Sequence, residues 1–500
     1  MTKYILAIDQ GTTSSRAIVY NENLEIVGTG QQIFPQHFPS PSWVEHDLDD
    51  IWHSVEVSIK SAIASVRDSG FDVQKIVGIG ITNQRETFGV WERATSRPVG
   101  RAIVWQCRRS ANICDRLKKT SAAKTLETLS GLKVDPYFSG TKLKWMLDED
   151  KDLRARAKAG ELAFGTMDTF LLWKLSSGDV HATDVSNASR TLLMDIKTLK
   201  WSDKALKILG IPQSLLPEIK DSDAVFGVTR GLGYLPDKIP ICGILGDQQA
   251  ALFGQACFVP GEAKITYGTG AFFLLNTGTK ICRTKAGVST VAWRVQGKTT
   301  YALEGSVFIA GAAVQWLRDG LKLFQNSSDI ENLAKEASDN DGVFFIPALS
   351  GLGAPYWEAN ARGLIGGLTR RSTKAHVARA CLEGIAHSIG DTFEQLVRDS
   401  SKKLLRLKVD GGASLNGLLL QAQADYLQSK IQRPRDIEST ARGAASLAAL
   451  SIGLVSKMTE LESKNPVVHD VAPQMKKSQV LAERKLWQKR VKALVELSKT

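Results

Sequence analysis

The sequence predicts an α/β protein built from two similar halves, each organised around a β-hairpin with a glycine and threonine turn. Residues 4–20 read as the first hairpin, because apolar runs flank a turn of Gly11 and small hydroxyl residues. Residues 263–276 repeat this plan. Each half also carries a strand that ends in a polar turn, which predicts a duplicated domain. We place the two domains at residues 1–250 and 251–500.

In the first half, strands alternate with helices. Residues 51–67 carry apolar side chains at helical spacing. Residues 75–83 form a near-continuous apolar run, typical of a parallel strand with both faces covered. This strand delivers Gln84, Arg85 and Glu86 at its carboxyl end, where open α/β sheets bind ligands. The other elements expected here are a strand at 26–34, a polar loop at 43–50 that ends in helix-start residues, a strand at 102–105, a helix around 143–147 and a loop at 166–169.

The second half opens in the same way. An apolar strand stops before Asp247, and a helix of small residues follows it. Another strand ends at Gly411 and Gly412, after which Asn416 opens a long helix. The chain closes with a basic amphipathic helix whose charged face is solvated. The ranges expected for these elements are strands at 241–245 and 404–409 and helices at 250–256 and 476–492.

The composition is that of a globular protein, with 43% hydrophobic residues. No apolar run approaches the ~18 residues of a membrane helix, and no signal-peptide pattern precedes the first strand, so we expect a cytoplasmic protein without membrane insertion. The six cysteines contain no CxxC pair and do not cluster with the seven histidines. Free buried thiols are therefore expected rather than disulfides or a metal site.

The net charge of +12, with a pI of about 9.3, raises the possibility of nucleic-acid binding. Lysine and arginine are dispersed, however, and the basic segments lack the interleaved aromatics of a stacking platform. Attraction of an anionic small substrate fits the charge equally well. We therefore expect no nucleic-acid partner.

The turn of the first hairpin offers chemistry for a phosphate group. Gly11 lets the backbone approach a ligand, and the N–H groups and hydroxyls beside it are donors to phosphate oxygens. Asp9 is placed to hold a hydrated metal ion, and Arg16 can offset phosphate charge. The alternative is an ordinary polar turn. Because the chain has neither a P-loop nor the protein-kinase motifs, ATP would be held by the paired hairpins.

Ten motif-like stretches run in order along the chain. The most specific are GITNQRET (80–87) and DPYFSGTKLKW (135–145). The others include DQGTTSSR (9–16), TDVSNASRT (183–191), GDQQAALFGQ (246–255), TYGTGAFFLLNTG (266–278) and VDGGASLN (409–416). Together they resemble the FGGY family of carbohydrate kinases, and within it the kinases that phosphorylate glycerol.

The resemblance implies two duplicated actin/ribonuclease H-like domains with mixed sheets flanked by helices and an active-site cleft between them. It implies transfer of a phosphoryl group from ATP to glycerol, with Mg²⁺ as cofactor and sn-glycerol 3-phosphate and ADP as products. This is the first step of glycerol utilisation. The partners are then glycerol and ATP, and the expected assembly is a homodimer or homotetramer.

The resemblance also assigns the substrate site. Arg85 and Glu86 would hold glycerol hydroxyls, and Asp247 would act as general base in an in-line transfer. Taken alone, Arg85 and Glu86 could be a surface ion pair and Asp247 a helix N-cap. The other substrate residues implied are Tyr137 and Gln248 in the polar cage and Trp105 and Phe272 against the carbons.

Nucleotide and metal residues follow from the same motifs. The phosphates would face both hairpins, and Mg²⁺ would reach Asp9 and Asp247 largely through water. Asn416 also has an ordinary N-cap interpretation. The implied nucleotide residues are Thr12, Thr13, Ser14, Arg16 and Thr269 at the phosphates and Gly311, Gln315, Gly412 and Asn416 at the adenosine end.

Three residues depart from the family pattern, namely Phe88, Ile265 and Arg442. The segment 469–477 has lysine where regulated relatives carry an acidic residue. Together with the loop at 230–238, this predicts weak or absent control by fructose 1,6-bisphosphate or a sugar-transport phosphocarrier. Two other functions stay open, a kinase for a larger polyol or ketose and a nucleotide-driven chaperone or cytoskeletal protein.

Overall fold

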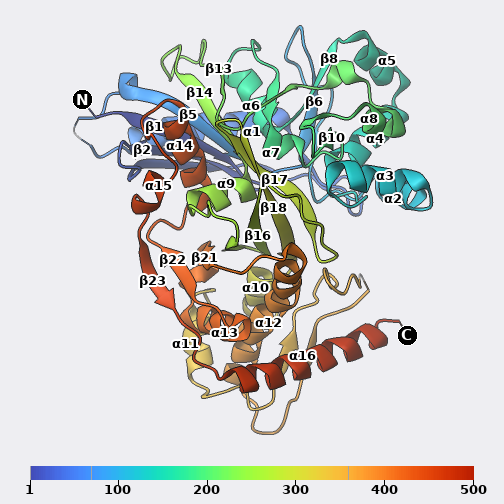
Figure 1. The fold of residues 1–500 in the computed structure, drawn as a ribbon, viewed down its shortest axis with the longest axis vertical. Helices are drawn as coiled ribbons and strands as arrows, with labels where there is room; N and C mark the ends of the chain where they lie inside the picture. Colours follow the sequence, from blue (N-terminus) through green and yellow to red (C-terminus); the bar gives the residue numbers. More distant parts are fainter. Residues whose placement is uncertain (1, 69, 359, 500) are drawn as a thin grey trace. The chain divides into compact units, whose positions relative to one another are not determined.

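The structure is a computed structural model that describes residues 2–68, 70–358 and 360–499 (Figure 1). The chain divides into two compact units, each assembled from three segments. Unit 1 comprises Met1–Ala256, Ser289–Tyr301 and Ser439–Lys464, and unit 2 comprises Cys257–Val288, Ala302–Glu438 and Asn465–Thr500.

Unit 1 is built on a six-stranded mixed sheet. The predicted N-terminal hairpin is confirmed, since β1 (Tyr4–Gln10) and β2 (Ser14–Asn21) pair antiparallel with Ile8 opposite Ala17. On its other side β1 pairs in parallel with β5 (Ile76–Asn83), and β5 pairs in parallel with β14 (Pro240–Gly246). The strand order is β13-β14-β5-β1-β2-β3, where β3 is Ile26–Ile33 and β13 is Val225–Val228.

Helices cover the strands of this sheet. The predicted first helix is α1 (Leu48–Ala64), which packs on β2 and β3. Helices α9 (Asp247–Gly254) and α14 (Ser439–Ser451) pack against each other, and α14 lies along β1, β5 and β14. A Cβ at Gly443 would lie 1.9 Å from the Ala250 carbonyl oxygen, so glycine is required for this close approach.

The rest of unit 1 contains a second sheet, β4-β7-β6-β8, with several helices. One expected loop is wrong here and another is right in part. The loop at 43–50 ends at the start of α1 as predicted but also contains the short strand β4, whereas the loop at 166–169 is the end of β8 and the start of α6, which is buried on almost every face. The bounds are β4 Glu45–His46, β6 Phe88–Glu92, β7 Ala102–Ile103, β8 Leu162–Thr166, β9 Ala182–Asp184, β10 Met194–Asp195, β11 Lys200–Trp201, β12 Glu218–Lys220, α2 Ala111–Lys118, α3 Ser121–Ser130, α4 Ser139–Glu149, α5 Lys151–Ala159, α6 Met167–Leu175, α7 Val185–Ala188 and α8 Asp203–Leu209.

Unit 2 repeats the plan of unit 1. The predicted second hairpin is confirmed as β15 (Glu262–Tyr267) and β16 (Ala271–Gly278). β15 pairs in parallel with β21 (Arg406–Asp410), as β1 pairs with β5. The seven-stranded sheet that contains this hairpin has the order β17-β18-β16-β15-β21-β22-β23, where β17 is Val288–Val295, β18 Lys298–Val307, β22 Ile431–Pro434 and β23 Val467–Val471. Residues 289–301 of β17 and β18 are counted with unit 1.

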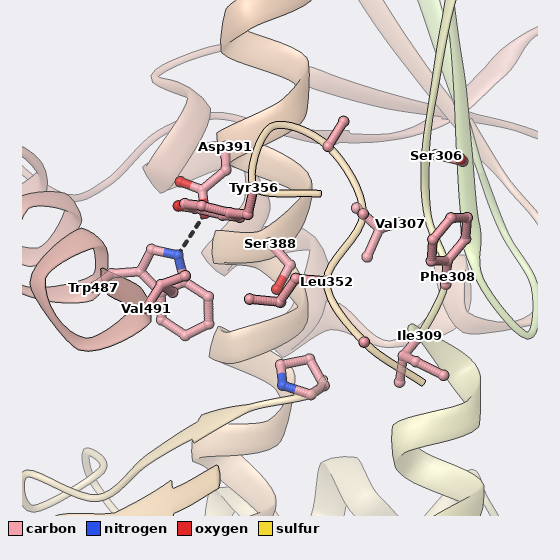
Figure 2. A pocket seen from close by; sticks show the side chains of 14 residues that line it. Ser306, Val307, Phe308, Ile309, Leu352, Tyr356, Ser388, Asp391, Trp487 and Val491 are labelled. Carbon is pink, nitrogen blue, oxygen red and sulfur yellow. Dashed lines mark hydrogen bonds between the residues drawn. The ribbon is translucent and has the colours of Figure 1, made fainter. Parts of the chain in front are cut away.

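The predicted terminal helix is α16 (Lys477–Leu497), which docks on α12 (Lys374–Ser400) through buried polar contacts. Asp391 accepts hydrogen bonds at 2.7 Å from Arg484, the Trp487 indole and the Tyr356 hydroxyl. Figure 2 shows Trp487 beside Asp391 at the edge of a cavity of about 30 Å³. The remaining elements are α10 Gly311–Asp319, α11 Asp329–Lys335, α13 Gly417–Leu427, α15 Glu460–Ser463, β19 Phe344–Ile346 and β20 Leu364–Gly366.

Candidate active site

The carboxyl ends of three parallel strands in unit 1 meet at one edge of the sheet. Gln10 of β1 lies opposite Asn83 of β5, and Asn83 lies opposite Gly246 of β14. The residues that follow these strands therefore gather at this edge, which is the usual ligand site of such sheets. They include the first hairpin turn, Arg85, Glu86 and Asp247.

Arg85 links the ends of β5 and β14. Its guanidinium Nε lies 3.0 Å from Asp247 Oδ1, and its Nη1 donates to Gln249 Oε1 at 3.2 Å. Its Nη2 lies 3.5 Å from the Tyr137 hydroxyl. The Arg85 side chain is 2% exposed and that of Asp247 is 31% exposed. Arg85 is thus a buried anchor, not part of a surface ion pair.

Asp247 is the first residue of α9, and Gly246 occupies the N-cap position. The N-cap interpretation of Asp247 is therefore wrong by one residue. Asp247 Oδ1 accepts the Gln248 N–H at 2.6 Å in addition to its contact with Arg85. A Cβ at Gly246 would lie 2.7 Å from Arg85 Cγ and Cδ, so only glycine leaves room for this arginine.

Glu86 is buried in a strained backbone conformation. Its φ is +62°, which is uncommon for a residue with a side chain. Its carboxylate Oε1 accepts a hydrogen bond from Arg190 Nε at 2.6 Å, and its carbonyl accepts from the Ser139 hydroxyl at 2.8 Å. Glu86 is 1% exposed and Arg190 is fully buried. Strain of this kind persists where the surroundings over-determine it, and it clusters at functional sites.

Two aromatic residues lie beside these charges. The Trp105 and Tyr137 rings pack edge to face with centroids 5.6 Å apart. Lys142 is fully buried behind them and donates to the carbonyls of Val104 and Tyr137 at 3.2 and 3.0 Å. Burial lowers the pKa of Lys142 to about 8, while the charge of Glu86 opposes the shift. The lysine therefore stays mainly cationic at pH 7 and fixes the backbone that carries both rings.

Hydrogen bonds from glutamine side chains fix the turn of the first hairpin. Gln84 Nε2 donates to Gln10 Oε1 and to the Gly11 carbonyl, each at 3.1 Å. On the other side the Trp105 indole donates to the Thr12 hydroxyl at 3.0 Å. Thr13 is exposed and Ser14 and Arg16 are half-buried, so these three candidate phosphate residues remain accessible.

Asp9 and Asp247 are the two carboxylates expected near Mg²⁺. Asp9 is half-buried near the end of β1, and Asp247 follows β14 at the same sheet edge. Among the described residues, no group of three or more histidine, cysteine, aspartate or glutamate side chains is arranged to hold a metal ion. Carboxylate oxygens are the kind of ligand that Mg²⁺ takes, and Asp9 and Asp247 supply them at this sheet edge.

The remaining candidates belong to unit 2 and gather around its hairpin turn. The Thr269 carbonyl accepts the N–H groups of Ala310 and Ala312 at 2.9 and 3.0 Å. A Cβ at Gly311 would lie 2.6 Å from the Gly268 carbonyl oxygen, which explains the glycine. Thr269 is exposed in this turn, and Gln315 is exposed on α10.

At the end of β21, the two consecutive glycines differ. Gly411 has φ +81° and lies against the Tyr267 carbonyl, whereas a Cβ at Gly412 would meet nothing within 4 Å. Asn416 is the N-cap of α13, with its Oδ1 accepting the Leu419 N–H at 2.9 Å. Phe272 lies on β16 and is half-buried.

Unit 1 therefore brings together most of the candidate substrate residues. Arg85, Tyr137 and Asp247 are in direct contact, Glu86 adjoins Arg85 in the chain, and Trp105 touches Tyr137. Gln248 is buried next to Asp247. Phe272 belongs to unit 2 and is not placed with this set.

Sequence reasoning missed three residues of the site, Gln249, Lys142 and Arg190. Gln249 is fully buried and joins Arg85 to Thr290 and to the Val291 carbonyl. All three lie within motifs quoted above, as polar residues among apolar or small ones. This pattern could have identified them, because a polar residue among apolar or small ones is often buried, and a buried polar or charged group needs a partner.

The three residues that depart from the family pattern are all buried. Ile265 and Phe88 are buried apolar residues of β15 and β6. Arg442 on α14 is 3% exposed and donates to the carbonyls of Leu24 and Lys464 at 2.8 and 2.6 Å. It therefore ties α14 to two loops of unit 1.

Two pockets lie in unit 2, along α12 and α16, and neither contains a candidate site residue. The first is the cavity of Figure 2. The second, of about 370 Å³, is lined by Tyr356, Glu394, Arg398 and Lys492 among others.

The fold and these sites define a carbohydrate kinase: the chain belongs to the FGGY family of carbohydrate kinases. Residues 4–254 match the N-terminal domain of that family and residues 263–452 match its C-terminal domain.

Within the family, curated proteins similar to this chain include glycerol kinases. The glycerol kinase of Myxococcus xanthus is 55% identical over 90% of this chain and 91% of its own length. That of Desulfitobacterium hafniense is 50% identical over 99% of this chain and 100% of its own.

Solved structures agree on the fold. The structure of Plasmodium falciparum glycerol kinase with ADP matches with a TM-score of 0.91 at 34% identity and covers 99% of this chain and 98% of that chain. A gluconate kinase from Lactobacillus acidophilus, at 23% identity, matches with a TM-score of 0.87 and shows the shared fold. Within the described part of the chain, no helix has the length and apolar character needed to cross a membrane.

Proposed function

We propose that this protein catalyses the ATP-dependent phosphorylation of glycerol to sn-glycerol 3-phosphate, the first step of glycerol utilisation. The observation that carries the proposal is the set of Arg85, Glu86, Tyr137 and Asp247 at the strand ends of unit 1, held by ion pairs and hydrogen bonds. The nearly full-length similarity to glycerol kinases supports it.

A three-carbon triol suits such a site. Glycerol offers little apolar area, so its recognition depends on pairing each hydroxyl, because an unpaired buried polar group is costly. Arg85 supplies donors, Glu86 and Asp247 supply acceptors, and the Tyr137 hydroxyl supplies either. Gln248 adds a further contact. Trp105 and Phe272 would pack against the carbon atoms.

The proposed general base is Asp247. Among the described residues, the contacts of Asp247 with Arg85 Nε and with the Gln248 N–H both reach Oδ1. This fixes the carboxylate and directs Oδ2 as the oxygen that accepts a proton. In an in-line transfer, the glycerol hydroxyl oxygen attacks the γ-phosphorus, the bond to the ADP oxygen breaks, and the hydroxyl proton moves to Oδ2.

The nucleotide would lie between donors of both hairpin turns. Thr12, Thr13, Ser14 and Arg16 would face the phosphates, as would Thr269. Gly311, Gln315, Gly412 and Asn416 would line the adenosine end. Asp9 and Asp247 would hold Mg²⁺ through water. When bound, this ion neutralises phosphate charge, and the basic protein supplies a favourable field for an anionic substrate.

The resemblance to the family further supports a cytoplasmic homodimer or homotetramer. Light scattering coupled to size-exclusion chromatography tests the assembly, since a monomer at micromolar concentration contradicts it.

Release of ADP with and without glycerol tests the proposed function. We expect ADP release with Mg²⁺ and ATP to rise at least a hundredfold on adding glycerol, and much less on adding xylulose or gluconate. A stronger response to a larger polyol or ketose would reassign the substrate. ATP turnover that is independent of any polyol would favour a chaperone-like or cytoskeletal function.

A further inference from the structure

We propose that the buried segment 184–190 is a positioning element for the polyol site and that Arg190 within it orients Glu86. The inference rests on the proposed function and deepens it, because it names residues that set the geometry of the contacting groups without touching the substrate. Every residue of the segment is buried. Its side chains reach the ends of both strands that carry the candidate substrate residues.

The first link runs from Asp184 to the end of β14. Asp184 Oδ1 accepts the Ser186 hydroxyl at 2.9 Å, and the Ser186 Oγ accepts the Gly246 N–H at 3.0 Å. Since the Ser186 hydroxyl donates to one group and accepts from the other, its orientation is fixed. Gly246 directly precedes Asp247, so this chain of two hydrogen bonds sets where the proposed base begins its helix.

The second link reaches the end of β5. Asn187 and Asn83 exchange side-chain amide hydrogen bonds at 3.0 and 3.2 Å, and Asn187 Nδ2 also donates to Asp184 Oδ1 at 3.0 Å. Asn83 Nδ2 donates in addition to the Gln84 carbonyl at 2.9 Å. The turn that delivers Arg85 and Glu86 is thereby tied to the same aspartate as Gly246.

The third link is the contact of Arg190 with Glu86, at 2.6 Å between Nε and Oε1. The Arg190 guanidinium carbon also lies 5.2 and 5.7 Å from the ring centroids of Phe138 and Tyr137. A buried carboxylate is stable as an anion only beside a compensating cation. Arg190 therefore compensates the charge of Glu86 and fixes the orientation of its side chain. It also lies next to Tyr137, a second candidate substrate residue.

A fourth link supports Arg85. The hydroxyls of Ser189 and Thr290 lie 3.0 Å apart, Gln249 Nε2 donates to Thr290 Oγ1 at 3.2 Å, and Gln249 Oε1 accepts from Arg85. All four links thus end on a substrate residue or on its chain neighbour. A hydrogen-bonded polar network fixes one geometry more closely than apolar packing does.

Three variants and a matched control test the proposal. Ser186→Ala removes one buried oxygen, so the protein should fold, and we expect kcat/KM for glycerol to fall about 3- to 30-fold. Arg190→Met should lower kcat/KM for glycerol at least 100-fold, and Arg190→Lys should recover part of the loss because it keeps the charge. The KM for ATP should change less than threefold in all three. Arg442→Met removes another buried arginine of unit 1 and should leave the glycerol parameters unchanged.

A measurement without turnover separates this proposal from the proposed function. Hydrogen exchange at the Gly246 amide should be at least tenfold faster in Ser186→Ala than in the wild type, whatever the substrate is. If the wild type shows no glycerol-dependent turnover, the proposed function fails, while faster Gly246 exchange still supports the positioning role. Unchanged Gly246 exchange, or folded Ser186→Ala and Arg190→Met variants with wild-type glycerol kinetics in an active enzyme, would overturn the positioning role.

Discussion

Asp247 combines partial exposure with a fixed orientation, which is what a general base requires. Its Oδ1 is occupied by Arg85 and by the Gln248 N–H, so the carboxylate cannot rotate freely. Its position at the start of α9 also places it at the positive end of the helix dipole. The carboxylate is therefore held in one orientation before substrate arrives.

Replacing Asp247 with asparagine should abolish most of the activity. Asparagine has the same size and can keep the contacts of Oδ1, but it cannot accept the proton. We expect kcat to fall by about 10²–10⁴-fold with little change in ATP binding. Asp203→Asn is the matched control, because Asp203 is likewise the first residue of a short helix in unit 1. If Asp247→Asn retained a tenth of the wild-type kcat, Asp9 would become the next candidate base.

Asp168 is a buried carboxyl with a strongly shifted pKa. Burial and, secondarily, the charge of Asp184 raise the pKa of Asp168 to about 7, although the hydroxyls of Thr166 and Thr183 each donate to it at 2.6 Å. An unfolded aspartic acid ionises near pH 4. Between these values the folded state holds a proton that the unfolded state has lost, so stability falls as pH rises.

Asp168→Asn should therefore remove a pH dependence of stability. Asparagine cannot ionise, so the stability of the variant should lack the decrease with rising pH that Asp168 causes. Between pH 5 and pH 8 the free energy of unfolding of the wild type, relative to the variant, should fall by roughly 2 kcal/mol. Urea denaturation at both pH values measures this difference. A difference that is the same at pH 5 and pH 8 would show that Asp168 does not titrate in this window.

At the scale of elements, the two hairpins place their turns differently. The turn of β1 and β2 is held from behind by side chains, with Gln84 on Gly11 and Trp105 on Thr12. The turn of β15 and β16 is held by the backbone at the start of α10, through the carbonyls of Gly268 and Thr269. Each turn is thus fixed while its threonine remains accessible for a phosphate.

The turn after β21 offers a matched pair of glycine substitutions. Gly411→Ala should destabilise the protein by about 1–3 kcal/mol, because φ is +81° and the new Cβ would lie 2.3 Å from the Tyr267 carbonyl. Gly412→Ala points into open space and should leave stability unchanged. If adenosine lies against Gly412, that variant should weaken ADP binding about 3- to 10-fold without affecting glycerol binding.

Thermal unfolding and ADP titration calorimetry separate the two effects. Wild-type ADP affinity in Gly412→Ala would remove Gly412 from the adenosine site. Equal losses of stability in both variants would contradict the strained geometry assigned to Gly411 alone.

At the scale of the whole molecule, the candidate residues for the two ligands are divided between the units. The polyol set belongs to unit 1, apart from Phe272, and the adenosine set belongs to unit 2. Each unit is also held by its own core, with apolar clusters around β1 and β5 in one and around β15 and α12 in the other. Each ligand should therefore protect a different set of backbone amides from hydrogen exchange.

Hydrogen exchange followed by mass spectrometry tests this division. Glycerol alone should slow exchange at 83–87 and 246–249, and ADP alone should slow it at 268–270, 311–315 and 411–416. Peptides of α16 serve as the internal control, because no candidate residue lies there. Protection by glycerol confined to unit 2 would contradict the assignment of the substrate residues.

Local sequence determined the elements whose signal is local. Apolar runs broken by glycine and small hydroxyls marked both hairpins, and the run that ends at Asn83 marked a buried parallel strand. The same reasoning failed at 166–169, because threonine and aspartate favour both turns and helix starts and only the burial of α6 decides between them.

Tertiary structure alone decided which partners the polar residues have. The contacts of Arg190 with Glu86 and of Asn187 with Asn83 join residues 104 positions apart, and Arg442 reaches Leu24 across 418. Periodicity reports which face of an element is apolar, but not which distant element lies against it. Strand order and register set those neighbours, so the sequence by itself determined the strands, turns and candidate motifs, and the fold determined the network that positions them.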